Sequence, residues 1–293
     1  MELLRKNEKI LCIFGLTAAL LIGAVVWYSE IPAQTLRHPE SIPNQVKAVI
    51  LPHHLLVGPL IEEFYRQLSA NNDYGRIFLI SPNHFDYGFH YVQTTDTPDP
   101  TKIIGDLDLE SIKDLAASRS LSIEPEFYPR EHGITVHLPF IRKFFPKAKV
   151  IPIIIKRTTP EKILNALADE LLKISDEKTL IIASIDFSHY EEEKYALKND
   201  RHTINWLENL ENNPPEHLLN DLKALALSAK ENAGEEVGMD SPESLYVTAV
   251  LLNHLKAAHW SLWARTSSAM LMPGLKPKDN TSHIFGYFTK SGE

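Results

Sequence analysis

The stretch VILPHHLLVG, residues 49–58, runs as an apolar strand candidate to Pro52 and continues with two histidines, His53 and His54. Runs rich in β-branched residues are found at 46–51, 76–80, 149–155 and 179–185. Their nearly continuous apolar composition indicates strands that are covered on both faces. In open α/β sheets, ligands bind outside the carboxyl ends of the strands, so histidines at such an end are candidates for function.

Helical patterns separate these strand candidates. Apolar residues recur at i, i+3 and i+4 spacing within 58–70, 108–117, 158–174 and 241–255, and two charged helices are expected at 192–211 and 215–231. Two further strand-like segments follow, at 260–267 and 283–290. The alternation predicts an α/β domain over residues 46–293, with a mostly parallel central sheet flanked by helices and a Pro-rich tether at 31–45 before it.

The composition is that of a globular chain, since 44% of the 293 residues are hydrophobic and 23% are charged. The net charge of -8 and the pI of about 5.9 argue against nucleic acid as a partner, because phosphate backbones require clustered Lys and Arg. Cys12 is the only cysteine, so the chain can form no intrachain disulfide and no thiolate cluster for zinc. A metal ion bound to this chain therefore needs nitrogen and oxygen ligands.

The amino-terminal segment differs from the rest of the chain. Residues 10–28 carry no charge and are long enough to cross a bilayer as one helix, and they follow the basic residues Arg5, Lys6 and Lys9. By the positive-inside rule, this pattern predicts a membrane anchor within residues 1–30 and a single-pass protein whose domain lies outside the cytoplasm. A cleaved signal peptide is the alternative, although the apolar stretch is longer than usual and no clear A-x-A site follows.

Two more strand ends carry histidine. His84 follows the second strand candidate in SPNHF, and Asp186 and His189 follow the fourth in DFSHY. Because the carboxyl ends of neighbouring parallel strands lie at one edge of a sheet, we expect these side chains to converge with His53 on one site. A structural alternative stays open for Asp186, whose carboxylate can bond backbone amides in its own turn.

A further segment, REHGITVHLPFI, contributes Glu131, His132 and His137. The two histidines are five residues apart and would point to different faces of a helix, so at most one of them enters the same cleft. We expect His132 to be that residue and to take part in catalysis. For Glu131 the structural alternative is a helix cap.

These segments, in this order, resemble the Memo family, also called AmmeMemoRadiSam system protein B. The resemblance rests on LPHH, SPNHF, EHGITVHLPFI, SIDFSHY and the final TSHIFGYFTK, and it covers about residues 46–290. It implies a fold like that of the class III extradiol dioxygenases, which use non-haem iron, and a pocket of two histidines and a cysteine associated with copper or iron. By this resemblance His53 and His84 are the metal-ligand candidates, and His189 matches the acid–base histidine of the dioxygenases.

The chain departs from the family pattern at the cysteine. The segment GMDSP, residues 238–242, places Gly238 where the family has its cysteine. Asp240 or Glu243 could supply a carboxylate instead and give the two-histidine, one-carboxylate set that suits iron(II), whereas copper(I) prefers soft ligands. Either carboxylate could equally serve only the start of the following helix, where the helix dipole favours acidic residues.

These residues support three functional hypotheses. In the first, a metal-dependent oxidoreductase binds iron or copper through His53, His84 and a carboxylate, and acts on an unidentified small molecule. Asp186 orients a neighbouring imidazole there, and His189 transfers protons. In the second, the pocket binds a metal or small ligand without turnover, and the domain acts through a protein partner; in the third, the same residues serve metal-assisted hydrolysis. If the loop were shifted by one residue, His54 rather than His53 would point into the site, although the family spacing favours His53.

Overall fold

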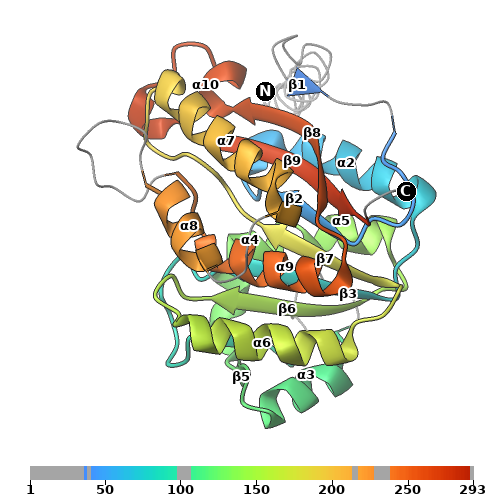
Figure 1. The fold of residues 1–293 in the computed structure, drawn as a ribbon. Helices are drawn as coiled ribbons and strands as arrows, with labels where there is room; N and C mark the ends of the chain where they lie inside the picture. The colour runs from blue at the N-terminus through green and yellow to red at the C-terminus, as the bar shows by residue number, and fades with distance from the viewer. Residues whose placement is uncertain (1–35, 38–40, 98–106, 213–216, 228–237, 291–293) are drawn as a thin grey trace, which may run out of the picture. The chain divides into compact units, whose positions relative to one another are not determined.

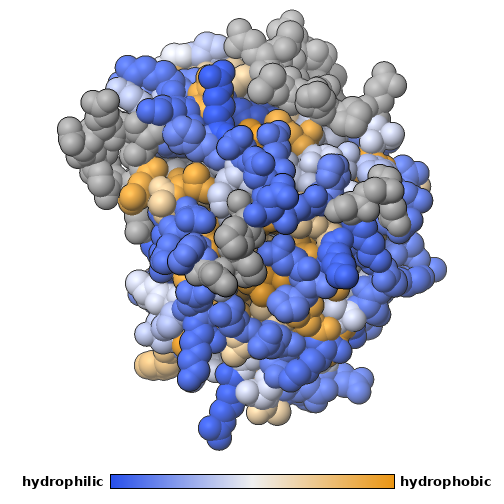
Figure 2. Space-filling view, viewed as in Figure 1, coloured by the Kyte–Doolittle hydropathy of each residue, from blue (hydrophilic) through white to orange (hydrophobic). Residues whose placement is uncertain are grey.

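The computed structural model describes residues 36–37, 41–97, 107–212, 217–227 and 238–290. Within these ranges the chain forms a single β-sheet with helices on both of its faces (Figure 1). The front face of the molecule is covered largely by hydrophilic side chains, with smaller hydrophobic areas between them (Figure 2). The expected α/β class is therefore observed.

The sheet has nine strands in the described residues, in the order β1-β8-β9-β2-β7-β3-β6-β4-β5. Their bounds are β1 Leu36–Arg37, β2 Ala48–Leu51, β3 Arg76–Pro82, β4 Val92–Thr94, β5 Ser122–Ile123, β6 Lys149–Ile155, β7 Thr179–Ser184, β8 His259–Ser267 and β9 Ser282–Thr289. Each strand candidate of the sequence forms a strand, while β1, β4 and β5 are short strands that the sequence did not predict.

Four neighbouring strands, β2, β7, β3 and β6, run parallel and form the centre of the sheet. Almost all of their residues are buried, which explains their uninterrupted apolar sequences. The prediction of a mostly parallel sheet is nevertheless wrong. The outer pairs β1–β8, β8–β9, β9–β2 and β4–β6 are antiparallel, because the β8–β9 pair joins one edge of the parallel centre and β4 folds back along the other.

Helices pack on both faces of this sheet, and each of the expected helices is present. Their bounds are α2 Gly58–Asn71, α3 Leu109–Ala117, α4 His132–Thr135, α5 Leu138–Phe144, α6 Glu161–Ile174, α7 Glu193–Glu208, α8 Leu218–Leu225, α9 Pro242–Leu255 and α10 Ser268–Leu271. Figure 1 shows α6, α7 and α9 in front of the sheet and α2 and α5 behind it. The parallel strands are thereby covered on both sides.

Helix α9 begins where the sequence predicts. The Oγ of Ser241 accepts a hydrogen bond from the backbone N–H of Ser244 (3.1 Å), and Pro242 is the first residue of the helix. The helix packs against α6, α8 and the central strands β7 and β3. Just before it, Met239 pairs with Phe187, the third residue after β7. The start of α9 is thereby fixed beside the carboxyl end of β7.

A buried ion pair holds the loop that follows β7. Asp200 on α7 accepts hydrogen bonds from the hydroxyls of Ser188 (3.0 Å) and Ser282 (2.7 Å). The guanidinium of Arg265 on β8 lies 2.7 Å from the same carboxylate, and both charged side chains are almost fully enclosed. Because a buried charge is costly without a partner, this arrangement ties the loop to both α7 and β9.

The structure corrects the membrane prediction. No helix in the described ranges is both long and apolar enough to cross a membrane. The most apolar of the longer helices, α9, has 14 residues, which span about 21 Å against the roughly 30 Å of a bilayer core. This finding contradicts the prediction of a single-pass membrane protein with its domain outside the cytoplasm. Residues 10–28, on which that prediction rested, lie outside the described residues.

Candidate metal centre

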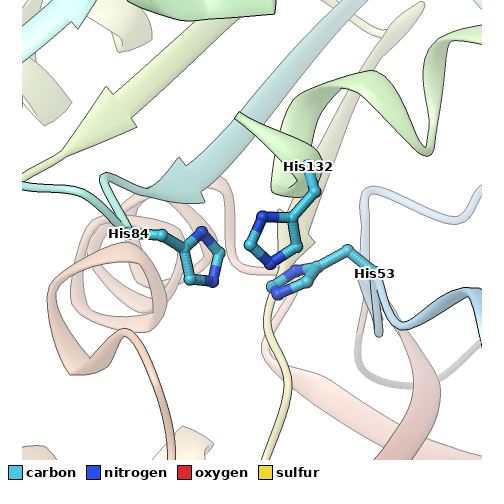
Figure 3. A group of neighbouring side chains, drawn as sticks. All are labelled: His53, His84 and His132. Carbon is cyan, nitrogen blue, oxygen red and sulfur yellow. The ribbon is translucent and has the colours of Figure 1, made fainter. Parts of the chain in front are cut away.

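The predicted site residues lie together at the carboxyl edge of the parallel strands. His53 follows β2, His84 follows β3 and Asp186 follows β7, and these strands are direct neighbours in the sheet. His132 is the first residue of α4, and its ring and those of the other two histidines point toward one another (Figure 3). Ring centroids are 4.8 Å apart for His53 and His84 and 3.9 Å apart for His84 and His132. The structure brings these side chains together, and their roles stay predictions.

The imidazole of His53 is buried and is oriented by hydrogen bonds. Its backbone N–H donates to Oδ1 of Asp186 (3.2 Å), and its Nδ1 lies 3.0 Å from Oγ of Ser184. The Ser184 hydroxyl donates to the carbonyl oxygen of Gly133 (2.7 Å), so its oxygen accepts the Nδ1–H of His53. Nε2 of His53 then faces the carboxylates of Asp186 (3.5 Å) and Asp240 (3.1 Å).

His84 is held between two carboxylates. Glu131 accepts hydrogen bonds from Nδ1 of His84 (2.5 Å) and from its backbone N–H (3.0 Å), while Nε2 of His84 lies 3.5 Å from Oδ2 of Asp240. Burial alone would lower the pKa of His84, but the hydrogen bonds and charges of Asp240 and Glu131 outweigh burial and raise this pKa to about 10. A metal ion that binds at Nε2 therefore competes with a proton.

Asp240 comes from the segment before α9 and faces both of these histidines. Its backbone N–H donates to the carbonyl oxygen of Asp186 (3.1 Å), and the backbone N–H of Asp186 donates to Oδ2 of Asp240 (3.2 Å). Oδ1 of Asp240 is buried and has no hydrogen-bond partner among the described residues. Burial would raise the pKa of Asp240, but His53 and His84 hold it below its usual value. The carboxylate is therefore ionised, and its Oδ1 could bind a cation without breaking a hydrogen bond to a described residue.

Only one histidine of the segment around α4 enters the cluster. The side chain of His132 is half-exposed there, and burial together with the two neighbouring imidazoles lowers its pKa to about 4. His137 lies in the core instead, where its Nδ1 contacts the hydroxyl of Tyr65 (3.1 Å) and burial lowers its pKa to about 3. Both rings are neutral at pH 7, but only His132 can offer a lone pair to the cluster.

Asp186 contacts histidines on two sides. It accepts the backbone N–H of His53, and its Oδ1 lies 3.4 Å from Nδ1 of the buried His283 on β9. Burial would raise the pKa of Asp186, but His53 and His283 hold it well below its usual value. The carboxylate thus bonds a backbone amide, as the structural alternative required, although this amide belongs to the loop after β2 rather than to its own turn.

A pocket of about 480 Å³ adjoins the cluster. Its lining includes His84, Asp240, His189, Arg157 and Tyr190. Burial lowers the pKa of His189 below its usual value, despite the opposing charges of nearby carboxylates, so its ring is neutral at pH 7. A small molecule in this pocket would contact the ligand candidates His84 and Asp240 and the neutral imidazole of His189 at the same time.

Glu243, the second carboxylate considered as a ligand, lies in a different environment. It is fully buried in the first turn of α9, and its Oε1 is 3.7 Å from Nζ of Lys223 on α8. Neither group of potential metal ligands in the described part of the chain includes it. The geometry therefore favours Asp240 of the two.

Two overlapping groups of side chains in the described residues could hold a metal ion. Their ligand atoms lie within 4.8 Å of one another, and the groups are His53, His84 and His132, and His53, Asp186 and Asp240. Oδ2 of Asp240 connects the two groups, because it lies within 3.5 Å of the Nε2 atoms of both His53 and His84. The donors are imidazole nitrogens and carboxylate oxygens, one of them buried without a partner, so these residues fit a divalent metal ion.

Several residues around the cluster have roles that the sequence did not reveal. Glu131 does cap α4, because it accepts the backbone N–H of Gly133 (3.0 Å), but the same carboxylate also binds a histidine ring. Ser184 is the last residue of buried β7 and His283 the second residue of buried β9, and the only sequence signal for either is a polar residue in a buried strand. The ring of His54 lies beside that of His283, with centroids 5.3 Å apart, and its Nδ1 accepts a backbone N–H in the next turn.

Comparisons with known proteins agree with the resemblance seen in the sequence. A family model described as Memo-like protein matches residues 29–256, which is more than half of the chain. A MEMO1 family protein of Saccharolobus solfataricus is 30% identical over 172 residues, covering 55% of this chain and 60% of that protein. A MEMO1 family protein of Nitrosopumilus maritimus is 27% identical over 190 residues, covering 63% of this chain and 67% of that protein.

Among solved structures, the crystal structure of an uncharacterized protein from Escherichia coli K12 aligns with 82% of this chain and 99% of its own, at a TM-score of 0.48 and 14% identity. The match to the S. solfataricus relative spans 60% of that protein's length. The family match is broader on this chain and includes every segment that contributes to the cluster, from LPHH to GMDSP. The resemblance is thus confirmed, and the chain belongs to the Memo-like protein family.

Proposed function

We propose that this domain is a metal-dependent oxidoreductase that binds one iron(II) ion between His53, His84 and Asp240 and acts on a small molecule in the adjoining pocket. The position of Asp240 carries the proposal, because its Oδ2 lies 3.1 Å from Nε2 of His53 and 3.5 Å from Nε2 of His84. Two imidazole nitrogens thus face one carboxylate oxygen, which are the donor types of the two-histidine, one-carboxylate iron(II) sites.

The charges around these atoms support a bound cation. The ion pairs of Glu131, Asp186 and Asp240 go only to histidines among the described residues. Without a metal, protons on His53 and His84 must balance the carboxylates, which is why the pKa values of both are raised although burial opposes this. A divalent cation can replace those protons, because buried carboxylates need positive partners.

The ligand atoms favour iron(II) over copper(I). Copper(I) prefers thiolate and thioether ligands, whereas imidazole with a carboxylate suits iron(II). The only cysteine of the chain, Cys12, lies outside the described residues. The atom that faces both Nε2 atoms is instead the carboxylate oxygen of Asp240.

The protonation of the other residues suggests their roles. A redox-active ion held by His53, His84 and Asp240 would supply Lewis acidity and electron transfer beside the pocket. His189 lines the pocket with its pKa lowered by burial, so its neutral ring can accept a proton from a bound substrate. Asp186 accepts a hydrogen bond from the backbone N–H of His53 and thereby helps to orient the imidazole of His53. His132 is neutral as well and can accept a second proton or bind the ion itself.

Anaerobic titration of the metal-free protein with Fe²⁺ tests this proposal. We expect one ion per chain and the release of at least one proton at neutral pH, because His84, with its pKa of about 10, is protonated before the ion binds. Since proton and ion compete for Nε2, the apparent affinity should rise with pH throughout the range below that pKa and fall as the solution is acidified. Calorimetry in buffers of different ionisation enthalpy measures the stoichiometry and the protons released.

Two other outcomes would favour the alternatives. Stoichiometric zinc, rather than iron, in protein isolated from its natural source would point to metal-assisted hydrolysis at the same residues. No binding of Fe²⁺ or of other divalent ions would point to a ligand-binding domain that acts through a protein partner.

A further inference from the structure

A continuous chain of hydrogen bonds joins the Nδ1 atoms of His84 and His53 behind the cluster. Nδ1 of His84 donates to Oε1 of Glu131 (2.5 Å), and the same oxygen accepts the backbone N–H of Gly133 (3.0 Å). The carbonyl oxygen of Gly133 accepts the hydroxyl of Ser184 (2.7 Å), whose oxygen lies 3.0 Å from Nδ1 of His53. Glu131 and Ser184 are both buried, at 2% and 0% exposure, so water does not compete for these bonds.

The residue in the middle of this chain of hydrogen bonds, Gly133, must be a glycine. A Cβ at Gly133 would lie only 2.0 Å from Oγ of Ser81 on β3 and 3.1 Å from its Cβ. The missing side chain lets α4 begin directly against β3, and α4 and β3 are in contact in the fold. The N–H of Gly133 can therefore reach Glu131 while its carbonyl oxygen reaches Ser184 on β7.

Glu131 also connects the two rings to the third histidine. Its Oε2 accepts the backbone N–H of His84 (3.0 Å), so the carboxylate fixes the loop after β3 as well as the ring. The same residue is the N-cap of α4, whose first residue is His132, and Nδ1 of His132 lies 3.8 Å from Oε1. A single buried carboxylate thus sets the positions of two histidines of the cluster.

We propose that Glu131 and Ser184 are positioning residues that hold the Nδ1 sides of His84 and His53, so that both Nε2 atoms face Asp240. This inference rests on the proposed function, because it assigns the two Nε2 atoms to one metal ion. A hydrogen bond at the far ring nitrogen fixes the tautomer and the rotation of a metal-binding imidazole, and its loss typically weakens metal affinity by about 10–100-fold. Both partners bond the backbone of Gly133, Glu131 at its N–H and Ser184 at its carbonyl oxygen, so a change at either of them should disturb both rings.

Glu124, the residue after β5, offers a matched control because it binds the loop that carries His84. It accepts hydrogen bonds from Nδ1 of His90 (2.5 Å) and from the backbone N–H groups of His90 (3.1 Å) and Phe89 (2.9 Å). This carboxylate therefore repeats the contacts of Glu131 with a histidine whose side chain is 63% exposed and does not belong to the cluster. Glu124→Gln removes an equivalent charge that contacts the same loop.

Binding of Co²⁺, followed by its visible absorption, tests the inference. We expect Glu131→Gln and Ser184→Ala each to weaken Co²⁺ binding by about 10–100-fold and to change the absorption spectrum of the bound ion. Glu124→Gln should retain the affinity and the spectrum of the wild type. Ser184→Ala removes only a hydroxyl, so the inference can still be tested with this variant if Glu131→Gln does not fold. Wild-type affinity and spectrum in both Glu131→Gln and Ser184→Ala would overturn the inference.

Proton NMR of the metal-free protein separates this inference from the proposed function. The Nδ1 proton of His84, in its short bond to Glu131, should give a resonance downfield of the backbone amides. Glu131→Gln should remove this signal, and Glu124→Gln should keep it. A wild type that binds no Co²⁺ would overturn the proposed function. Absence of the signal in the wild type, or its persistence in Glu131→Gln, would overturn the positioning role of Glu131.

Discussion

Binding of iron or copper should be lost in His53→Ala and in His84→Ala. These variants remove, one at a time, the two imidazole nitrogens that face Oδ2 of Asp240. Loss of a residue that merely supports a ligand costs about 10–100-fold in affinity, so loss of a ligand should cost more than about 100-fold. The double variant should be no worse than either single variant, because one imidazole alone does not retain the ion. Anaerobic titration of all three variants with Fe²⁺ measures the effect.

His54→Ala is the matched control for this prediction. His54 is the next residue in the chain, but its Nδ1 accepts the backbone N–H of Leu56 (3.3 Å) and its ring lies beside His283. The variant should bind Fe²⁺ within about twofold of the wild type. Full affinity in His53→Ala or in His84→Ala would show that the residue is not a ligand. A loss in His54→Ala with full binding in His53→Ala would mean that the loop presents the other imidazole.

Asp240→Asn should weaken Fe²⁺ binding, and Asp240→Cys should shift the preference toward copper(I). The first change keeps the shape of the side chain but removes a negative charge beside a divalent cation, and we expect at least a loss of about tenfold, or about 1.4 kcal/mol. The second change supplies, two residues after Gly238, the soft thiolate ligand that the family pattern has in this segment. Iron(II) and copper(I) affinities of both variants, measured anaerobically beside the wild type, decide the matter.

Glu243→Gln is the matched control for the Asp240 variants. It makes the same kind of substitution three residues further on, where the carboxylate lies 3.7 Å from Nζ of Lys223 rather than beside a histidine. Its metal affinity should equal that of the wild type. If Asp240 serves only the start of α9, its variants should change stability by about 1 kcal/mol or less and leave metal affinity unaltered. An effect at Glu243 alone would move the third ligand to that residue.

The centre of the sheet explains why much of the site could be predicted from the sequence. The apolar runs that end at Leu51, Pro82 and Ser184 are buried on both faces, and such runs are the strongest sequence signal of parallel strands. Once those strands are neighbours, the polar residues that follow them must lie at one edge of the sheet. The convergence of His53, His84 and the segment from Asp186 could therefore be predicted without any tertiary information.

Asp240 could not be singled out in the same way. The Ser241-Pro242 pair at the start of α9 correctly predicted a helix start, but a helix start suits any nearby carboxylate, so Asp240 and Glu243 were equivalent in the sequence. What separates them is the pairing of Met239 with Phe187 and the two backbone bonds between Asp240 and Asp186. These contacts join segments 54 residues apart, and no local pattern predicts them.

Contacts between segments far apart in the sequence also determine the outer strand pairs of the sheet and the residues that bond the Nδ1 atoms of His53 and His84. The sequences of β8 and β9 are typical of strands, but no local feature of them indicates that β9 pairs antiparallel with β2. Glu131 was recognised as a helix cap, while its bond to His84 depends on the loop after β3 approaching α4. Long-range pairing thus accounts for the errors in topology and for the contacts that were missed.

The position of the metal ion itself is the most direct test. Crystals grown with Fe²⁺ or Co²⁺, with data collected at the absorption edge of that metal, locate the ion by anomalous scattering. We predict one peak per chain, at about 2.0–2.2 Å from Nε2 of His53, from Nε2 of His84 and from a carboxylate oxygen of Asp240. A peak at any other group of residues, or no peak in crystals grown with excess metal, would contradict a metal centre at these three side chains.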